Sequence, residues 1–302
     1  MELDTFLNLS TEEVASIVRA HGPKVCVFPI NGTRRWFLME NEISPGDDYM
    51  SLYLSAIIEN HIGLYKLFFE HGVDTLLTPA LGVDLWERGD EYVQMVAEGF
   101  AALANHPDFL TFFEHYQVKA GFYGDYRKFL TGTNYVRLLN TFDEVKNKTS
   151  QNGRHRLFFG LFASDATESV AELAVTYYQQ HGVIPGRKKI IELYYGEYIQ
   201  PVNFFVGFDK FSAFDMPLLT SGFEDLYFTV SPSAYLSQNQ LREILFDHLY
   251  LRPKQEPEYQ EMSSDSWERT KQFYKTHRET TLGVGVLRDG IWYPKLPDKQ
   301  QK

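Results

Sequence analysis

Residues Lys24–Ile30 read KVCVFPI and lead directly into Asn31–Trp36, which read NGTRRW. The first stretch is short and apolar, which predicts a buried strand, and Pro29 is expected to end its hydrogen-bonded ladder. The second stretch then predicts a loop at the carboxyl end of that strand. Open parallel sheets bind their ligands at this end, so the basic loop is the first candidate for a functional site.

The alternation of apolar strands and helical patterns continues along the chain. We predict strands over residues 74–80, 119–124, 156–162, 204–208 and 226–230, and helices over 10–20, 47–70, 84–105, 166–180, 188–198 and 238–251. Residues 131–154 are polar and predict a surface loop. Strands that alternate with helices predict a single α/β domain with a mostly parallel central sheet and helices on both faces. We expect this domain to span residues 1–251, with residues 252–302 as a C-terminal extension packed on or near it.

The composition argues against several classes of protein. The 302 residues carry 40 acidic against 29 basic side chains, a net charge of −11, so a nucleic-acid polymer is not expected as a partner. Cys26 is the single cysteine, and no disulfide framework is predicted. The N-terminus lacks the apolar segment of a signal peptide, and no apolar stretch predicts a transmembrane helix. We therefore expect a cytoplasmic protein.

The residues of Asn31–Trp36 have the chemistry of an anion site. Gly32 lets backbone N–H groups approach an anion closely. Arg34 and Arg35 add delocalised charge and forked donors, which suit phosphate oxygens. The alternative is a solvated turn with two ordinary arginines. The sequence contains no P-loop, no dinucleotide-binding glycine motif, no zinc-ligand spacing of histidines and no hydrolase elbow.

These residues also resemble a known motif. Asn31–Trp36 is similar to the first motif of the cis-prenyltransferases, which runs Asp-Gly-Asn-Gly-Arg-Trp and holds the diphosphate of an allylic substrate. Lys210–Phe214 reads KFSAF and resembles the Arg-x-Ser-Asn-Phe of that family, and Asp225–Thr229 reads DLYFT and resembles its Glu-Leu-Tyr-Phe-Thr. The resemblance implies a cis-prenyltransferase-like fold, with residues 1–251 as the catalytic domain.

A closer resemblance, over almost the whole chain, is to the family of tuberculosinyl adenosine transferases or (iso)tuberculosinol synthases, which has the same fold. The similar blocks are Gly22–Pro29, Gly32–Phe37, Asp47–Tyr49, Phe69–Gly72, Arg88–Asp90, Phe122–Tyr126, Glu168–Ala171, Tyr194–Tyr198 and Asp289–Trp292. The resemblance implies an enzyme that ionises an allylic, C20 diterpenoid diphosphate and passes the cation to a small acceptor, water or the N1 atom of adenosine. It further implies a homodimer that uses no organic cofactor. The many aromatic residues fit cation stabilisation, with core packing as the alternative.

The resemblance also implies roles for single residues. Arg34 and Arg35 bind the diphosphate and stabilise it as it leaves, while Gly32 and Thr33 offer backbone N–H groups. Further residues with implied roles in the site are Tyr49, Tyr92, Trp36, Asp47, Asp48, Arg88, Asp90 and Lys210.

Several of these roles have a structural alternative. Tyr49 and Tyr92 match tyrosines that orient the diphosphate or the nucleophile, or they pack on helices. Asp47 and Asp48 suit Mg²⁺ or an acceptor, but Asp48 also suits a helix N-cap. Arg88 and Asp90 lie about one turn before Tyr92 and could support it, and Lys210 takes the place of a phosphate-binding arginine or lies on the surface.

The sequence departs from the family patterns in three places. Asn31 replaces an aspartate, so a Mg²⁺ site and proton removal are both weakened there. Phe204 stands where chain-elongating enzymes carry an arginine, which disfavours a cis-prenyl chain-elongating synthase. Roughly four extra residues, about one helical turn, lie between Tyr49 and Gly72. A catalytically impaired binding subunit of the same fold, disabled by Asn31, stays open as an alternative.

Overall fold

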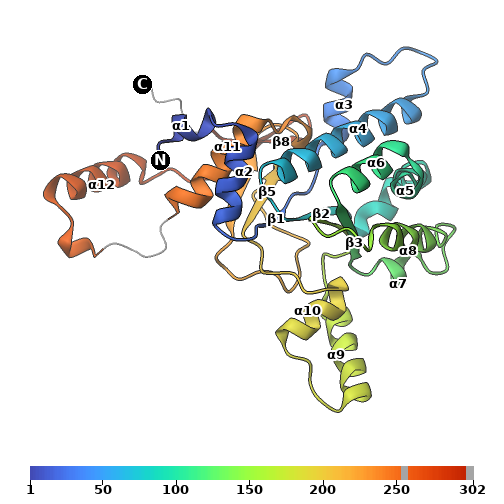
Figure 1. Ribbon diagram of the computed structural model, residues 1–302. Helices are drawn as coiled ribbons and strands as arrows, with labels where there is room; N and C mark the ends of the chain where they lie inside the picture. Colours follow the sequence, from blue (N-terminus) through green and yellow to red (C-terminus); the bar gives the residue numbers. More distant parts are fainter. Residues whose placement is uncertain (253–257, 297–302) are drawn as a thin grey trace.

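The computed structural model describes residues 1–252 and 258–296 (Figure 1). Six parallel strands form the central sheet in the order β3-β4-β2-β1-β5-β6. Their bounds are β1 Val25–Val27, β2 Thr75–Leu81, β3 Val118–Tyr123, β4 His155–Leu161, β5 Phe204–Phe208 and β6 Asp225–Thr229. The predicted α/β class with a parallel sheet is confirmed. β1 pairs with both β2 and β5, so it is an inner strand. The residues that follow β1 therefore leave the sheet near its middle.

One face of the sheet carries the larger part of the core. Cys26, Leu76 and Phe204 belong to this side and are completely buried. The helices that pack on it are α1 Leu3–Leu7, α2 Thr11–Ala20, α4 Tyr49–Glu70, α5 Asp90–Asn105, α6 Pro107–His115, α8 Leu138–Thr149 and α11 Gln238–Phe246.

The opposite face is covered more thinly. Val25, Leu77 and Phe205 lie on it and pack with Ile191 and Tyr195 of α10, Arg187–Tyr195. In Figure 1, α9, Thr167–His181, lies beyond α10, and it buries none of its side chains. Successive residues of a strand point to opposite faces, which is why neighbours such as Leu76 and Leu77 enter different cores. Helices on both faces are therefore confirmed.

Much of the aromatic content lies in the larger core. The ring of Phe122 lies 4.4 Å from that of Phe142 and 5.3 Å from that of Phe159, and Phe28 lies 4.8 Å from Phe68. These five side chains are all buried. For them, the alternative of core packing is the correct one.

Two predicted loops are helical, and both predictions were wrong. Residues 31–35 do not form a loop, because α3, Thr33–Glu40, begins directly after Gly32. Residues 131–154 contain α8, in which Leu138, Phe142 and Val145 are buried. That spacing of three and four residues places apolar side chains on one face of a helix, although the stretch as a whole is polar.

The predicted helix over residues 84–105 is divided at Gly89, whose φ is 88°. A short helical segment, η1 Val83–Arg88, precedes Gly89 and α5 follows it. Arg88 is therefore the last residue of η1 and does not belong to α5.

The C-terminal region contains α12, Ser264–His277, and a hairpin of β7 Gly285–Arg288 and β8 Ile291–Pro294. In Figure 1, α12 lies apart from the sheet, and it buries no side chain. Trp292 of the hairpin lies 6.4 Å from Phe211, between ring centroids. In residues 1–252 and 258–296, no helix is both long and apolar enough to span a bilayer.

Candidate active site

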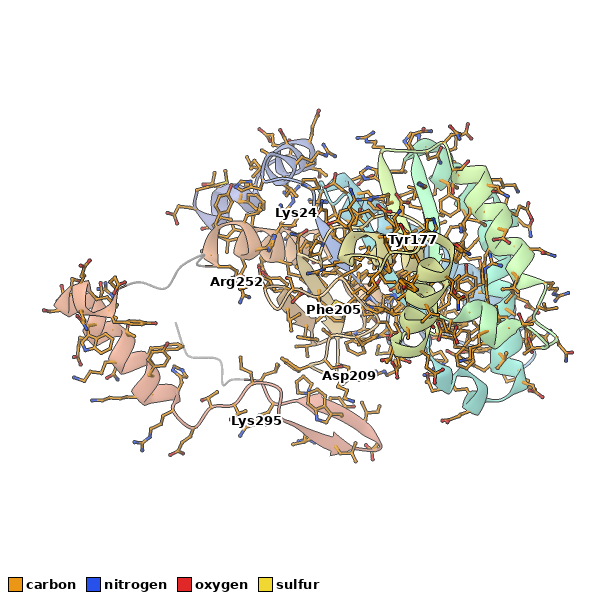
Figure 2. All side chains as sticks on the ribbon, turned by 90° about the horizontal axis from the view of Figure 1, so that it is seen from below. Lys24, Tyr177, Phe205, Asp209, Arg252 and Lys295 are labelled. Atoms are coloured by element: carbon orange, nitrogen blue, oxygen red, sulfur yellow. The ribbon has the colours of Figure 1, made fainter. Side chains whose placement is uncertain are left out.

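A cavity of about 810 Å³ opens at the carboxyl ends of the central strands. Residues at or just after the ends of β1, β2 and β5, namely 30–35, 78–82, 208–210, 212, 214 and 215, contribute to its wall, and α4 and α5 supply most of the remainder. Figure 2 labels Phe205 within β5 and Asp209 just beyond the end of that strand. The cavity thus lies where open parallel sheets bind ligands, and its size is typical of a small-molecule site.

The cationic mouth of the cavity is built on the first turn of α3. Gly32 precedes the helix with φ 77°, and a Cβ at this position would lie 2.7 Å from Cε1 of Phe208. Arg34 and Arg35 follow in the first turn, and both line the cavity. The backbone N–H groups of a helix N-terminus and two guanidinium groups therefore face the same space. This arrangement favours an anion more strongly than the predicted loop does.

Arg35 is held by two contacts. Its Nη2 donates to Oδ2 of Asp209 at 2.9 Å, and its guanidinium carbon lies 4.8 Å from the centroid of the Phe208 ring. Both partners lie at or just after the end of β5, so the strand next to β1 positions this arginine. Lys210 also lines the mouth and is exposed to solvent.

Tyr92 of α5 lies at the centre of a second cluster of basic side chains. The guanidinium carbons of Arg34 and Arg88 lie 5.0 Å and 5.2 Å from the centroid of its ring. Arg88 also donates from Nη1 to the Tyr92 hydroxyl at 3.1 Å and pairs with Asp84 at 2.5 Å. Arg88 is the last residue of η1, and Tyr92 lies in the first turn of α5. One ring thus joins two arginines from separate elements at the cavity mouth.

Tyr53 takes the place at the cavity that the sequence predicted for Tyr49. The Tyr53 hydroxyl lies 2.9 Å from Oγ1 of Thr33, and burial raises the pKa of Tyr53 to about 12. Tyr49 is not among the residues that line the cavity and stacks on Tyr53 at 5.8 Å between ring centroids. The spacing of four residues on α4 was the signal available in the sequence, because it places both tyrosines on one face.

The inner part of the cavity is apolar. Its wall combines aliphatic and aromatic side chains from α4, α5, α6 and β4: Leu54, Ile57, Ile58, Tyr65, Met95, Val96, Phe100, Leu103, Phe109 and Phe159. Gly99 of α5 also lines the cavity and has no side chain to fill it. A Cβ at this position would lie 3.4 Å from Cδ1 of Leu54. This inner wall suits a hydrocarbon, whereas the mouth suits an anion.

His61 is a polar exception in the apolar wall. Its Nε2 is buried and finds no hydrogen-bond partner among the residues that the structure describes. Burial lowers the pKa of His61 to about 4, so the ring is neutral near pH 7. Sequence reasoning missed this residue because a lone histidine in a long apolar helix carries no motif.

Three carboxylates line the cavity, Asp84, Asp209 and Asp215. Asp84 and Asp209 are paired with arginines. Burial and the nearby Asp84 raise the pKa of Asp215 to about 6. Sequence reasoning missed all three, although Asp209 and Asp215 directly flank the Lys210–Phe214 motif, which was the signal available in the sequence. Within residues 1–252 and 258–296, no cluster of three or more histidine, cysteine or acidic side chains forms a ready metal site.

Other residues with predicted roles lie outside the cavity. Asp48 caps α4 by accepting from the backbone N–H of Ser51 at 3.1 Å, and Asp47 accepts from that of Ser44 at 2.8 Å. Trp36 packs against the small apolar cluster that contains Phe37. The structure therefore brings together Asn31, Gly32, Thr33, Arg34, Arg35, Arg88, Tyr92 and Lys210, but not Trp36, Asp47, Asp48, Tyr49 or Asp90.

Phe204 requires a correction. It is completely buried at the start of β5, on the core side, and it does not line the cavity. The carboxyl end of the strand, at Phe208, is the end that reaches the site. The absence of an arginine at Phe204 is therefore a property of the core, and it does not bear on the cavity.

Comparison with characterised proteins identifies two relatives over nearly the full chain. The sequence is 44% identical over 290 residues to tuberculosinyl adenosine transferase of Mycobacterium tuberculosis (strain CDC 1551 / Oshkosh), which is 95% of this chain and 96% of the relative. It is 26% identical over 292 residues to (+)-kolavelool synthase of Herpetosiphon aurantiacus, covering 92% of this chain and 91% of that protein. No protein-family model matches the sequence.

Two solved structures share the fold. The lavandulyl diphosphate synthase of Lavandula x intermedia, in complex with dimethylallyl diphosphate, superposes with a TM-score of 0.59 over 78% of this chain and 96% of that one, at 14% identity. A probable undecaprenyl diphosphate synthase of Campylobacter jejuni superposes with a TM-score of 0.56 over 77% and 97%, at 14% identity. The predicted cis-prenyltransferase-like fold is confirmed.

Proposed function

The chain belongs to the family of tuberculosinyl adenosine transferase, and from this premise we propose that it is a prenyltransferase or terpene synthase that releases diphosphate. Its substrate is an allylic C20 diterpenoid diphosphate. The enzyme ionises the substrate and passes the prenyl cation to a small acceptor, adenosine or water. The observation that carries this proposal is the division of one cavity into a cationic mouth on α3 and an apolar interior.

The mouth supports binding and departure of the diphosphate. The first turn of α3 offers backbone N–H groups, and Arg34 and Arg35 offer forked donors to the phosphate oxygens. When the allylic C–O bond breaks, its electron pair goes to the diphosphate oxygen. Donors already in place at that oxygen stabilise the new charge without further reorganisation, which lowers the barrier.

The interior supports the prenyl chain. Aliphatic side chains such as Leu54 and Met95 exclude water, and the aromatic side chains Tyr65 and Phe100 offer ring faces to a cation. A ring face contributes ~0.5–2 kcal/mol to a nearby cation. An apolar wall around the prenyl chain therefore favours binding of the substrate and keeps the prenyl cation from reacting with bulk water.

The donors of the cavity do not fit a resident Mg²⁺ ion. Mg²⁺ prefers several free carboxylate oxygens in octahedral geometry, but Asp84 and Asp209 are engaged by arginines, which leaves Asp215 as the one unpaired carboxylate among the described residues of the wall. Asn31 offers a neutral amide in place of the aspartate that the resemblance leads one to expect. We derive no step through a metal, and assign the stabilisation of the leaving group to Arg34, Arg35 and α3.

Pyrophosphate release is the experiment that tests this function. The purified protein is given geranyl, farnesyl, geranylgeranyl and bicyclic C20 diphosphates, with and without adenosine, and products are identified by mass spectrometry. We expect release from the C20 substrates, with a terpene alcohol or a prenylated nucleoside as product. Binding of these diphosphates without any release would instead establish the impaired binding subunit.

We also propose that the enzyme acts in the cytoplasm as a homodimer. Val175 and Tyr178 of α9, together with Ile184, are largely exposed, and apolar side chains grouped in this way suit contact with a second copy. Sedimentation equilibrium tests the dimer, and Tyr178→Lys should shift the mass towards a monomer. A wild-type monomer at all concentrations would rule the dimer out.

A further inference from the structure

One of the three cavity carboxylates differs from the other two. Asp209 pairs with Arg35 at 2.9 Å, and Asp84 pairs with Arg88 at 2.5 Å. The carboxylate of Asp215 has no hydrogen-bond or ion-pair partner among the described residues, although it lines the same cavity. Two carboxylates thus position arginines, whereas the third is available to a ligand.

The backbone of Asp215 is held firmly. The Tyr123 hydroxyl donates to its carbonyl oxygen at 2.7 Å, and the flanking Phe214 ring packs 5.7 Å from Phe205, between centroids. Met216, on the other side, is buried. Asp215 itself has φ 53°, a left-handed conformation that is costly for a residue with a Cβ. Such conformations persist where the surroundings impose them, and they concentrate at functional sites.

The surroundings of Asp215 favour a base. Burial and Asp84 raise its pKa to about 6, so it is a stronger base than an ordinary aspartate and is still mostly ionised at pH 7. Other titratable groups near it are Tyr123, Tyr194 and Tyr195. Burial raises the pKa of each tyrosine well above 10, so none of them ionises near pH 6.

We propose that Asp215 is the catalytic base and acceptor-binding group of this site. This role rests on the proposed function. With water as acceptor, a lone pair of the water oxygen forms the new C–O bond with the prenyl cation. The O–H bond breaks, its electrons stay on oxygen, and the proton goes to the Asp215 carboxylate. The products are the terpene alcohol and protonated Asp215, which returns its proton to solvent.

With adenosine as acceptor, the same carboxylate has a different task. The N1 lone pair forms the C–N bond directly, and no proton has to leave for this bond to form. Asp215 then accepts a hydrogen bond from the exocyclic amino group and orients the ring. Asp215 thereby supplies the carboxylate that Asn31 lacks, from the segment between β5 and β6.

The test is the ratio of alcohol to pyrophosphate for the wild type, Asp215→Asn and Asp215→Glu. Asparagine can hydrogen-bond but cannot take a proton. We expect Asp215→Asn to keep pyrophosphate release while the ratio of alcohol to pyrophosphate falls at least roughly 10-fold, with hydrocarbons in place of alcohol. The adenosine adduct should fall less, and Asp215→Glu should restore part of the alcohol. Asp143→Asn, an exposed change on α8, is the matched control.

The pH profile adds a readout that a structural role would not move. The wild-type ratio should fall as the pH drops through about 6, the pKa of Asp215, and the ratio for Asp215→Asn should be flat. If Asp215→Asn fails to fold, the wild-type profile and Asp215→Glu still decide the question. An unchanged ratio in Asp215→Asn, or loss of pyrophosphate release from the folded variant, would overturn the role of Asp215 alone. Absence of pyrophosphate release from the wild type would overturn the proposed function itself.

Discussion

Nη2 of Arg35 donates to Oδ2 of Asp209 at 2.9 Å, which joins the first turn of α3 to the end of β5. The pair fixes the guanidinium at the cavity mouth before any ligand arrives. Because α3 also directs its backbone N–H groups there, the anion site is preorganised from two elements that meet only in the fold.

Replacement of Arg35 tests the anion site. We expect Arg35→Ala to lower kcat/KM for a prenyl diphosphate roughly 10²–10³-fold, as loss of one preorganised donor does elsewhere. The kcat/KM of Arg35→Lys should lie between those of the wild type and Arg35→Ala, because an ammonium group keeps the charge but not the forked pair of donors. Arg278→Ala, at an exposed site in the C-terminal region, is the control and should leave the rate unchanged. An Arg35→Ala enzyme with wild-type kinetics would remove the anion site from this position.

Gly32 and Gly222 both adopt a left-handed conformation, with φ of 77° and 83°, so Gly222 is a matched control for Gly32. Replacement of either glycine by alanine should lower the free energy of unfolding by roughly 1–2 kcal/mol, because a Cβ is unfavourable in this conformation. Only Gly32→Ala also places a Cβ 2.7 Å from Phe208, whereas no atom lies within 4 Å at Gly222. We expect Gly32→Ala to lose more stability and most of its turnover, measured by urea unfolding and pyrophosphate release. Equal effects of the two changes would show that the contact with Phe208 does not matter.

The neutral side chain of Asn31 leads us to expect that activity does not depend on Mg²⁺. We expect the wild-type rate to be the same in EDTA and in Mg²⁺, since arginines engage two of the three described cavity carboxylates and Asp215 alone is a poor magnesium site. Asn31→Asp adds a carboxylate beside the diphosphate and should acquire several-fold stimulation by Mg²⁺. A wild type that is inactive in EDTA and recovers with Mg²⁺ would contradict this expectation.

His61 predicts a pH effect on stability. Its pKa is about 4 when folded and about 6.5 when unfolded, so between these values the unfolded chain binds more protons. Stability is therefore fully present above pH 6.5 and declines as the pH falls towards 4, by about 1.4 kcal/mol per pH unit from this group.

The variant His61→Leu removes that contribution and a buried nitrogen without a partner. We expect it to be more stable than the wild type by roughly 1 kcal/mol at pH 7, with a larger difference at pH 5. Urea unfolding at the two pH values measures this, and a difference that does not grow at pH 5 would refute the assignment.

A substitution at Gly99 tests how deeply the prenyl chain enters the apolar interior. Gly99→Leu should fill part of it and reduce turnover of C20 diphosphates more than that of geranyl diphosphate, because the shorter chain needs less depth. Gly63→Leu changes an exposed glycine on α4 with no atom within 4 Å and controls for the gain in helix propensity. The ratio of kcat/KM for the two chain lengths is the measurement. An unchanged ratio would mean that the chain does not reach Gly99.

The sequence predicted the sheet well and the site in part. Strands such as Phe204–Phe208 are short apolar runs between turn residues, so local pattern suffices for them. The arginines of α3 were found because their basic stretch comes soon after a predicted strand. The helical state of α3 was missed, because the residues that start it, Asn31 and Gly32, are more typical of a turn.

The missed residues share a physical reason. Asp215 lies in the irregular segment between β5 and β6, and only the packing of that segment brings it to the cavity. His61 and Tyr53 lie on α4, where the apolar pattern predicts burial but not which face meets a cavity and which meets the core. Residues placed by tertiary packing leave no local pattern in the sequence.

The ring of Tyr92 stands close to two like charges, Arg34 and Arg88, before any ligand is present. Asp84 offsets part of the repulsion between the two guanidinium groups in the empty mouth, and the negative charge of a bound diphosphate offsets the remainder. That relief does not end with the chemical step, because the liberated pyrophosphate carries more charge than the ester it came from. The features that favour ionisation therefore also favour retention of pyrophosphate, and we expect its release to limit the rate of turnover.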